Sequence, residues 1–160
     1  MKKLAFLLLL LLFLIPDSFA QTSYPQILPM KERAKVIDDL LEDRVQNLLP
    51  ELMRNAGIDM WVVVSREYNE DPVIKTLLPA TWHAARRRTI LVMYDKGGDK
   101  GVETLAVARY DVGTTFKKAW DKEKQPDQWE RLAEIIRERN PKKIGVNRSE
   151  HWGHADGLVV

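Results

Sequence analysis

Four possible metal ligands lie close together near the end of the sequence: Glu150, His151, His154 and Asp156. Carboxylates and imidazoles are the side chains that bind zinc and other divalent ions. Helical zinc motifs place two histidines four residues apart on one face, whereas His151 and His154 are three apart around a glycine. The spacing therefore favours a polar turn, capped by Ser149 or Glu150, over a metal site.

Aromatic and basic residues form a second group in the middle of the chain. Trp82 and His83 stand just before the run Arg86-Arg87-Arg88. Because the planar guanidinium of arginine suits bidentate binding of a carboxylate, this run is a candidate anion or carboxylate clamp. The alternative is that the three arginines form a solvated edge or pair with the acidic residues of a partner domain.

The near-neutral charge of the chain argues against binding partners that are attracted by long-range electrostatics, such as nucleic acid. The chain has a formal net charge of +2, and loss of residues 1–20, with Lys2, Lys3 and Asp17, leaves +1. So small a charge attracts neither nucleic acid nor anionic lipid. We therefore expect no nucleic-acid partner, although Trp82 beside the arginines could have suggested a base-stacking platform.

The remaining motifs assign no chemistry. The sequence has no cysteine, so it offers neither disulfides nor thiolate metal ligands. It has no nucleophile elbow and no glycine-rich phosphate loop after a strand. Asn147-Arg148-Ser149 matches the glycosylation sequon, which has meaning only in a host that glycosylates exported proteins. The residues thus give no catalytic group, no metal ligand and no cofactor for this chain.

Residues 1–20 have the organisation of a secretory signal peptide. Lys2 and Lys3 precede an unbroken apolar run, 4–15, and Ser18-Phe19-Ala20 supplies the cleavage site. The apolar run is short of the roughly 20 residues that a membrane-spanning helix needs. We expect an exported protein, periplasmic or extracellular, with no membrane segment after cleavage and one domain over residues 21–160.

Two amphipathic helices must support these groups, over 29–55 and 126–140, because apolar residues recur there every three or four positions. In the first helix the apolar residues are Ile37, Leu40, Leu41, Val45, Leu48, Leu49 and Leu52. Pro50 removes a backbone donor from this helix. We therefore expect a kink or a break into two helices at Pro50.

Apolar, β-branched runs predict strands at 60–64, 89–95, 102–110 and 143–147. The glycine-rich segment 96–101 predicts that the second and third strands form an antiparallel hairpin. The polar segment 66–88 is longer than an ordinary connection, and segments of that kind are often functional. The order of elements predicts an α/β fold, a mixed β-sheet with flanking helices.

Several stretches, in this order, resemble the amino-terminal domain of the creatinase/prolidase superfamily, and among its members the exported Xaa-Pro aminopeptidase-like proteins. The stretches are 56–64, 66–72, 89–92, 144–147 and 149–156. The resemblance covers the whole of residues 21–160. It implies a creatinase-type amino-terminal domain, truncated before a carboxy-terminal pita-bread catalytic domain.

The resemblance implies a division of labour between two domains. The missing domain would hold two divalent metal ions (Mn, Co or Zn), which activate the water that attacks the peptide. This chain alone would lack the metal ligands and be inactive. Its role would be to shape substrate access and support assembly, with its own catalytic domain, a peptide substrate and further copies in a homo-oligomer as partners. In creatinase-like relatives an arginine near the second strand reaches a neighbouring subunit's substrate, and Arg86 or Arg87 occupies that place. The resemblance therefore makes Arg86 and Arg87 candidate substrate-cleft residues, with Trp82 and His83 at the rim of the cleft. The alternative for Trp82 and His83 is that they only pack the surrounding loop.

A free-standing exported binding or assembly module without peptidase activity is the alternative function. The sequence does not distinguish the two, and it leaves the substrate, the metal and the oligomeric state open. A small metalloenzyme using His151 and His154 is the third hypothesis, which predicts stoichiometric bound metal.

Overall fold

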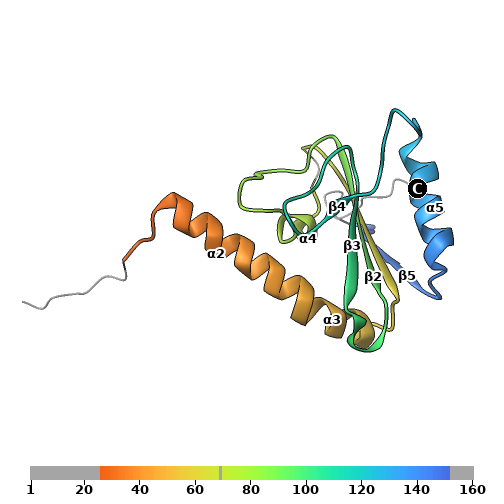
Figure 1. Ribbon diagram of the computed structural model, residues 1–160, viewed down its shortest axis with the longest axis horizontal. Helices are drawn as coiled ribbons and strands as arrows, with labels where there is room; N and C mark the ends of the chain where they lie inside the picture. The colour runs from red at the N-terminus through yellow and green to blue at the C-terminus, as the bar shows by residue number, and fades with distance from the viewer. Residues whose placement is uncertain (1–25, 69, 152–160) are drawn as a thin grey trace, which may run out of the picture.

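The computed structural model describes residues 26–68 and 70–151, which build a mixed five-stranded sheet with helices on both faces (Figure 1). The strand order is β4-β3-β2-β1-β5. In the centre of the sheet β2 runs antiparallel to both of its neighbours, β1 and β3. At the two edges β5 is parallel to β1 and β4 is parallel to β3. The strands are β1 (Met60–Arg66), β2 (Arg88–Asp95), β3 (Val102–Val107), β4 (Lys117–Lys118) and β5 (Ile144–Val146).

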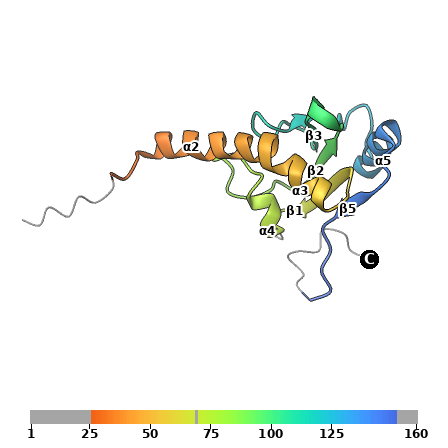
Figure 2. The same ribbon diagram turned by 90° about the horizontal axis from the view of Figure 1, so that it is seen from below.

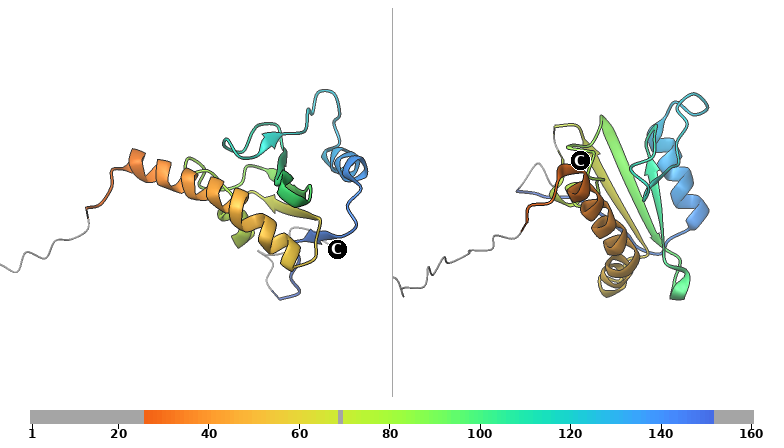
Figure 3. Two further views of the ribbon diagram at one scale, coloured as in Figure 1. Left: turned by 60° about the horizontal axis from the view of Figure 1, so that its bottom comes forward. Right: turned by 60° about the vertical axis from the view of Figure 1, so that its left-hand side comes forward.

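The strands β1 and β2 are buried on both faces, which explains their continuous apolar runs. Because neighbouring side chains of a strand point to opposite faces, β1 divides its residues between two cores. Val63 packs into one core with Leu91 and Met93, and Val62 packs into the other with Val92. The sheet therefore needs a helical layer on each side, and the views in Figure 3 show one on each.

The first helical layer is α2 (Met30–Asp43), a π-helical turn η1 (Arg44–Leu48) and α3 (Leu49–Asn55), which follow one another without a loop. The residues that this layer buries against the sheet are Leu41, Val45, Leu49 and Met53. A four-residue step overshoots a turn of regular α-helix by about 40°, so this series would spiral away from the sheet. The π turn contains more residues per turn and takes up the drift.

The predicted disruption at Pro50 occurs one turn earlier than expected. The backbone N–H of Leu49 bonds to the carbonyl of Arg44, the i→i−5 bond of a π turn. Pro50 itself lies in the first turn of α3, where a missing N–H costs little. The chain therefore changes helical register at 44–48 without breaking.

The second helical layer is α5 (Gln128–Arg139), which covers the other face with Leu132 and Ile135. The Asp127 carboxylate caps its first turn by accepting from the N–H groups of Trp129 and Glu130. Asn140 ends the helix in the left-handed conformation, φ 47°.

The predicted mixed sheet with flanking helices is confirmed, as is the antiparallel β2–β3 hairpin. Three short elements besides the π turn were not predicted: α4 (Pro72–Lys75) inside the long loop, the 3-10 turn η2 (Gly98–Lys100) in the hairpin, and the two-residue strand β4. The predicted signal peptide lies outside the described residues, and so do His154 and Asp156. Among the described residues no helix is both long and apolar enough to cross a bilayer.

Candidate functional site

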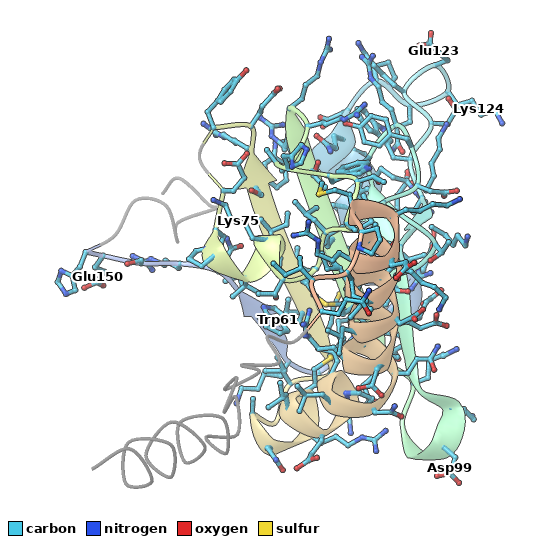
Figure 4. The ribbon with its side chains drawn as sticks, turned by 90° about the vertical axis from the view of Figure 1, so that its left-hand side faces the viewer. Trp61, Lys75, Asp99, Glu123, Lys124 and Glu150 are labelled. Atoms are coloured by element: carbon cyan, nitrogen blue, oxygen red, sulfur yellow. The ribbon has the colours of Figure 1, made fainter. Side chains whose placement is uncertain are left out.

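The predicted cleft residues gather at one end of the sheet. Figure 4 marks the two ends: Asp99 lies at the tip of the β2–β3 hairpin, and Glu123 and Lys124 lie at the opposite end. At the Glu123 end the start of β2, the segment after β3 and the connection into α5 enclose an open hollow of about 630 Å³. We call it the basic pocket; it is lined by Glu67, Arg86, Arg87, Arg88, Arg109, Tyr110, Trp120, Lys122 and Gln128.

Arg86 is held by two aromatic rings. Its guanidinium carbon lies 5.2 Å from the centroid of the Trp82 ring and 5.9 Å from that of Tyr110. The two rings meet edge to face, with their centroids 5.4 Å apart. The backbone of Arg86 is fixed as well, because its carbonyl accepts a 3.0 Å hydrogen bond from the Thr89 hydroxyl. Cation–π contacts leave the N–H groups of the guanidinium able to bind a ligand.

Arg87 adopts a backbone conformation that is unusual for a residue with a side chain, φ 52°. Such a left-handed residue costs about 1–2 kcal/mol. Two hydrogen bonds to Glu67 hold it: the Arg87 N–H donates to the Glu67 carboxylate at 3.0 Å, and the Glu67 N–H donates to the Arg87 carbonyl at 2.6 Å. The Glu67 carboxylate therefore contacts the backbone of the arginine run rather than a guanidinium.

Arg88 begins β2 and lies between the pocket and α5. Its guanidinium carbon is 4.9 Å from the centroid of the Trp129 ring. The buried Gln128 amide ties the helix to the sheet by donating to the carbonyls of Arg88 and Val107, at 3.1 and 2.6 Å. The Arg88 Nε is buried without a hydrogen-bond partner in the described structure. Buried donors without a partner are uncommon and call for an explanation.

The basic side chains of this pocket differ from the cations elsewhere in how they are paired. Within residues 26–68 and 70–151, the side chains of Arg86, Arg87, Arg88, Arg109 and Lys122 form no ion pair. The arginines outside the pocket that pair with carboxylates are Arg54, Arg131, Arg137 and Arg139. Five cations around one hollow, with Glu67 as its acidic lining residue, make a positive potential that favours an anion.

The electrostatics of Tyr110 reflect this environment. Burial raises the pKa of its hydroxyl above the usual 10.0, and the positive charges of Arg86, Arg87 and Arg109 oppose the rise. The phenol is therefore neutral at physiological pH, and it donates a long 3.4 Å hydrogen bond to the Arg86 carbonyl.

The loop that carries Trp82 and Arg86 is anchored at its start by a buried polar group. The Asn147 side chain accepts from the Val64 N–H at 2.9 Å and donates to the Val64 carbonyl at 3.0 Å, so it extends the pairing of β5 with β1. It also donates to the Asp71 carboxylate at 3.2 Å, while Asp71 caps α4 through the Val73 N–H.

The structure bears on two sequence motifs, the glycosylation sequon at 147–149 and the possible metal ligands that begin at Glu150. Asn147, the sequon asparagine, is 9 % exposed and uses both ends of its amide inside the fold, so in the folded chain it is a structural residue. Glu150 and His151 are both exposed, and Figure 4 shows Glu150 away from the sheet. The described residues contain no group of metal-binding side chains. The backbone N–H of His151 donates to the Ser149 hydroxyl at 3.2 Å, in agreement with a capped turn.

The structure brings together three of the four predicted cleft residues. Arg86 and Arg87 line the pocket and Trp82 supports Arg86. His83 is exposed and does not line it. Sequence reasoning missed Arg109, Tyr110, Trp120, Lys122 and Gln128. The register of β2 and β3 was a usable signal: Ile90 pairs with Val107, and two residues further on Arg88 falls opposite Arg109.

Comparisons with known proteins add no relative. No protein-family model, curated protein or solved structure matches the chain.

Proposed function

We propose that this chain is the non-catalytic amino-terminal domain of an exported metalloaminopeptidase that removes the residue before proline, and that its basic pocket binds a carboxylate of the peptide substrate. The observation that carries the proposal is the convergence of unpaired arginines on one hollow beside aromatic rings. The creatinase/prolidase-like stretches of the sequence supply the enzyme class. The chain would be periplasmic or extracellular.

The pocket matches the chemistry of a short proline-containing peptide. The free carboxylate of such a peptide can accept bidentate hydrogen bonds from a guanidinium. Its proline ring is apolar and fits against the aromatic side chains of Tyr110 and Trp120. Peptide cleavage would be the work of the second domain, whose carboxylates and histidine would hold two metal ions (Mn, Co or Zn). The proposed role of this domain is to orient the substrate and shape access to that site.

A free-standing exported binding module is the second candidate. The basic pocket is compatible with it as well, because five cations around one hollow attract an anionic ligand whether or not a catalytic domain follows. Such a module would bind its anionic ligand without any partner domain.

The binding test compares Ala-Pro with its carboxy-terminal amide, by titration calorimetry on the purified chain. We expect the free acid to bind and the amide to bind more weakly. Arg86→Ala should weaken binding of the acid about ten- to a hundredfold, since a hydrogen bond to a charged group contributes about 1.5–3 kcal/mol. Arg137→Ala is the matched control, because Arg137 is exposed on α5 and pairs with Glu130. Equal binding of acid and amide would refute the carboxylate role.

The spectrum of Tyr110 gives a second readout at the same site. Because Arg86 lowers the pKa of the Tyr110 hydroxyl, Arg86→Ala should raise that pKa further, as seen in an ultraviolet titration corrected with Tyr110→Phe. No change would mean that Arg86 does not lie over the ring in solution.

Two measurements test these assignments: the first tests the absence of activity that both candidates share, and the second separates the candidates. The purified chain should not hydrolyse Ala-Pro with or without added manganese, and turnover above a metal-only blank would overturn the non-catalytic assignment. An immunoblot of the source cells then gives the native size. A band several times heavier than this chain favours the two-domain peptidase, and a band of its own size favours the module.

A further inference from the structure

The first helical layer leaves a row of apolar side chains exposed beside its buried row. Ile37, Leu40, Leu48 and Leu52 are each 45–53 % exposed. We call this row the α2–α3 stripe; Arg44 stands in it between Leu40 and Leu48. It is continued toward the amino terminus by Ile27, Leu28 and Met30, which are also exposed. Scattered exposed leucines are ordinary, but a row of apolar side chains along one helix is the pattern of an interaction surface.

The π turn that aligns the buried row aligns this row as well. At about 100° per residue, Ile37 and Leu40 are separated by about 60° around the axis of α2, so they are neighbours on its surface. The spacing from Leu40 to Leu48 and on to Leu52 is a multiple of four, so in a regular helix the row would drift around the axis. Because η1 takes up the drift, Leu48 and Leu52 remain in line with Ile37 and Leu40.

The amino-terminal part of α2 extends away from the sheet (Figures 1 and 2). Leu41 is its only buried residue. A helix of this length is marginally stable in water without a packing partner. The sequence nevertheless gives this segment an apolar row, which is what a packed helix requires.

The charges on α2 indicate what covers the row. The first half of the helix carries Lys31, Arg33 and Lys35 against Glu32, whereas the second half carries Asp38, Asp39, Glu42 and Asp43. Two such helices repel each other when parallel. When antiparallel, the basic half of each faces the acidic half of the other.

We propose that the α2–α3 stripe binds the same stripe of a second copy of this chain, with the two α2 helices antiparallel and the two-fold axis between Ile37 and Leu40. In this arrangement Ile37 of each copy faces Leu40 of the other. Met30 then reaches Leu48, so the exposed apolar residues at the start of one copy cover the far end of the stripe on the other. The two sheets lie at opposite ends of the helix pair, because α2 extends away from its own sheet.

A membrane surface fits this helix less well than a second copy. Interfacial helices carry mainly Lys and Arg on the polar face. The helix α2 carries more carboxylates than cations: Glu32, Asp38, Asp39, Glu42 and Asp43 against Lys31, Arg33 and Lys35.

Light scattering on the purified chain tests the proposal. We expect a concentration-dependent mass of twice the chain, and Leu40→Glu should weaken the dimer at least about tenfold, because it replaces an apolar contact between the copies by a charged side chain. The control is Val146→Glu, since Val146 has similar exposure, 47 %, on the edge strand β5. Circular dichroism checks that both variants fold. Lys31→Glu/Arg33→Glu, which changes no apolar residue, should weaken the dimer too.

Orientation is tested with cysteines, which the natural sequence lacks. A mixture of Met30→Cys and Leu48→Cys chains should form a disulfide between copies, whereas neither variant should cross-link with itself. Self-cross-linking of Met30→Cys would refute the antiparallel arrangement. A chain that stays monomeric up to about 1 mM would overturn the dimer. Unchanged dimerisation of Leu40→Glu, or binding of the monomer to lipid vesicles through the stripe, would overturn it as well.

Discussion

Replacing Asn147 by alanine tests whether a buried amide joins the edge strand β5 to the loop that carries Trp82 and Arg86. The substitution leaves the N–H and the carbonyl of Val64 without their side-chain partner, and it removes a donor to Asp71. A buried polar group left unsatisfied costs about 1–3 kcal/mol. With two such backbone groups, we expect Asn147→Ala to lower the free energy of unfolding by about 2–5 kcal/mol. That is a large share of the roughly 5–15 kcal/mol that stabilises a typical domain.

Urea unfolding followed by tryptophan fluorescence measures this loss. The comparison holds if the slope against urea is the same for both chains. Asn55→Ala is the matched control, because Asn55 is an exposed residue at the end of α3, and it should change stability by less than about 0.5 kcal/mol. Asn147→Asp should cost more than Asn147→Ala, since it places a carboxylate against the Val64 carbonyl and the Asp71 carboxylate. A loss below about 1 kcal/mol for Asn147→Ala would refute the anchoring role.

Two further predictions concern an ion pair and a tight turn. Arg139 holds the pKa of Glu103 below its usual 4.5, so this pair stabilises the fold above pH 4.5 and stops doing so as the pH falls through the lowered value. The stability difference between wild type and Glu103→Gln should therefore shrink on acidification, and a difference that stays constant in urea titrations would contradict it. Gly113→Ala should destabilise more than Gly98→Ala: both glycines have positive φ, but the added Cβ would lie 3.0 Å from Pro79 at position 113 and meets nothing at 98. Equal losses would show that backbone strain alone matters.

The sequence predicted the sheet and both helical layers because hydrophobic periodicity records burial directly. It did not predict the π turn, since a spacing of three or four apolar residues looks helical whether or not the register slips. The uniform four-residue spacing of Leu41, Val45, Leu49 and Met53 carries that information, because a regular helix cannot keep such a series on one face. The strand β4 had no signal, because Lys117 and Lys118 are exposed and only their backbone pairs with β3.

The candidate site was predicted as far as local sequence allows. Arg86 and Trp82 are close in the chain, and their stacking follows from a short turn. Arg109 and Tyr110 could have been found from the predicted hairpin, whose antiparallel register puts the end of β3 beside the start of β2. Lys122 and Gln128 could not, since they reach the pocket only when the chain crosses the sheet to form α5. The prediction for His83 rested on its nearness to Trp82 alone, and the turn directs it to solvent.

The first helical layer contacts the loop that carries Trp82 and Arg86, and it also carries the α2–α3 stripe. The Asp38 carboxylate accepts from the Ala80 N–H at 2.8 Å, and the Arg44 guanidinium donates to the Thr76 carbonyl. Arg44 stands one helical turn after Leu40 and one before Leu48, so Leu40→Glu places a carboxylate next to a residue that holds the loop. Lys31→Glu/Arg33→Glu lies further from both contacts, and it weakens pairing of copies while the contacts that position Trp82 and Arg86 remain. A loss of carboxylate binding in that variant would then mean that a second copy orders the loop through α2, because no side chain of the pocket or of its contacts with α2 has been changed.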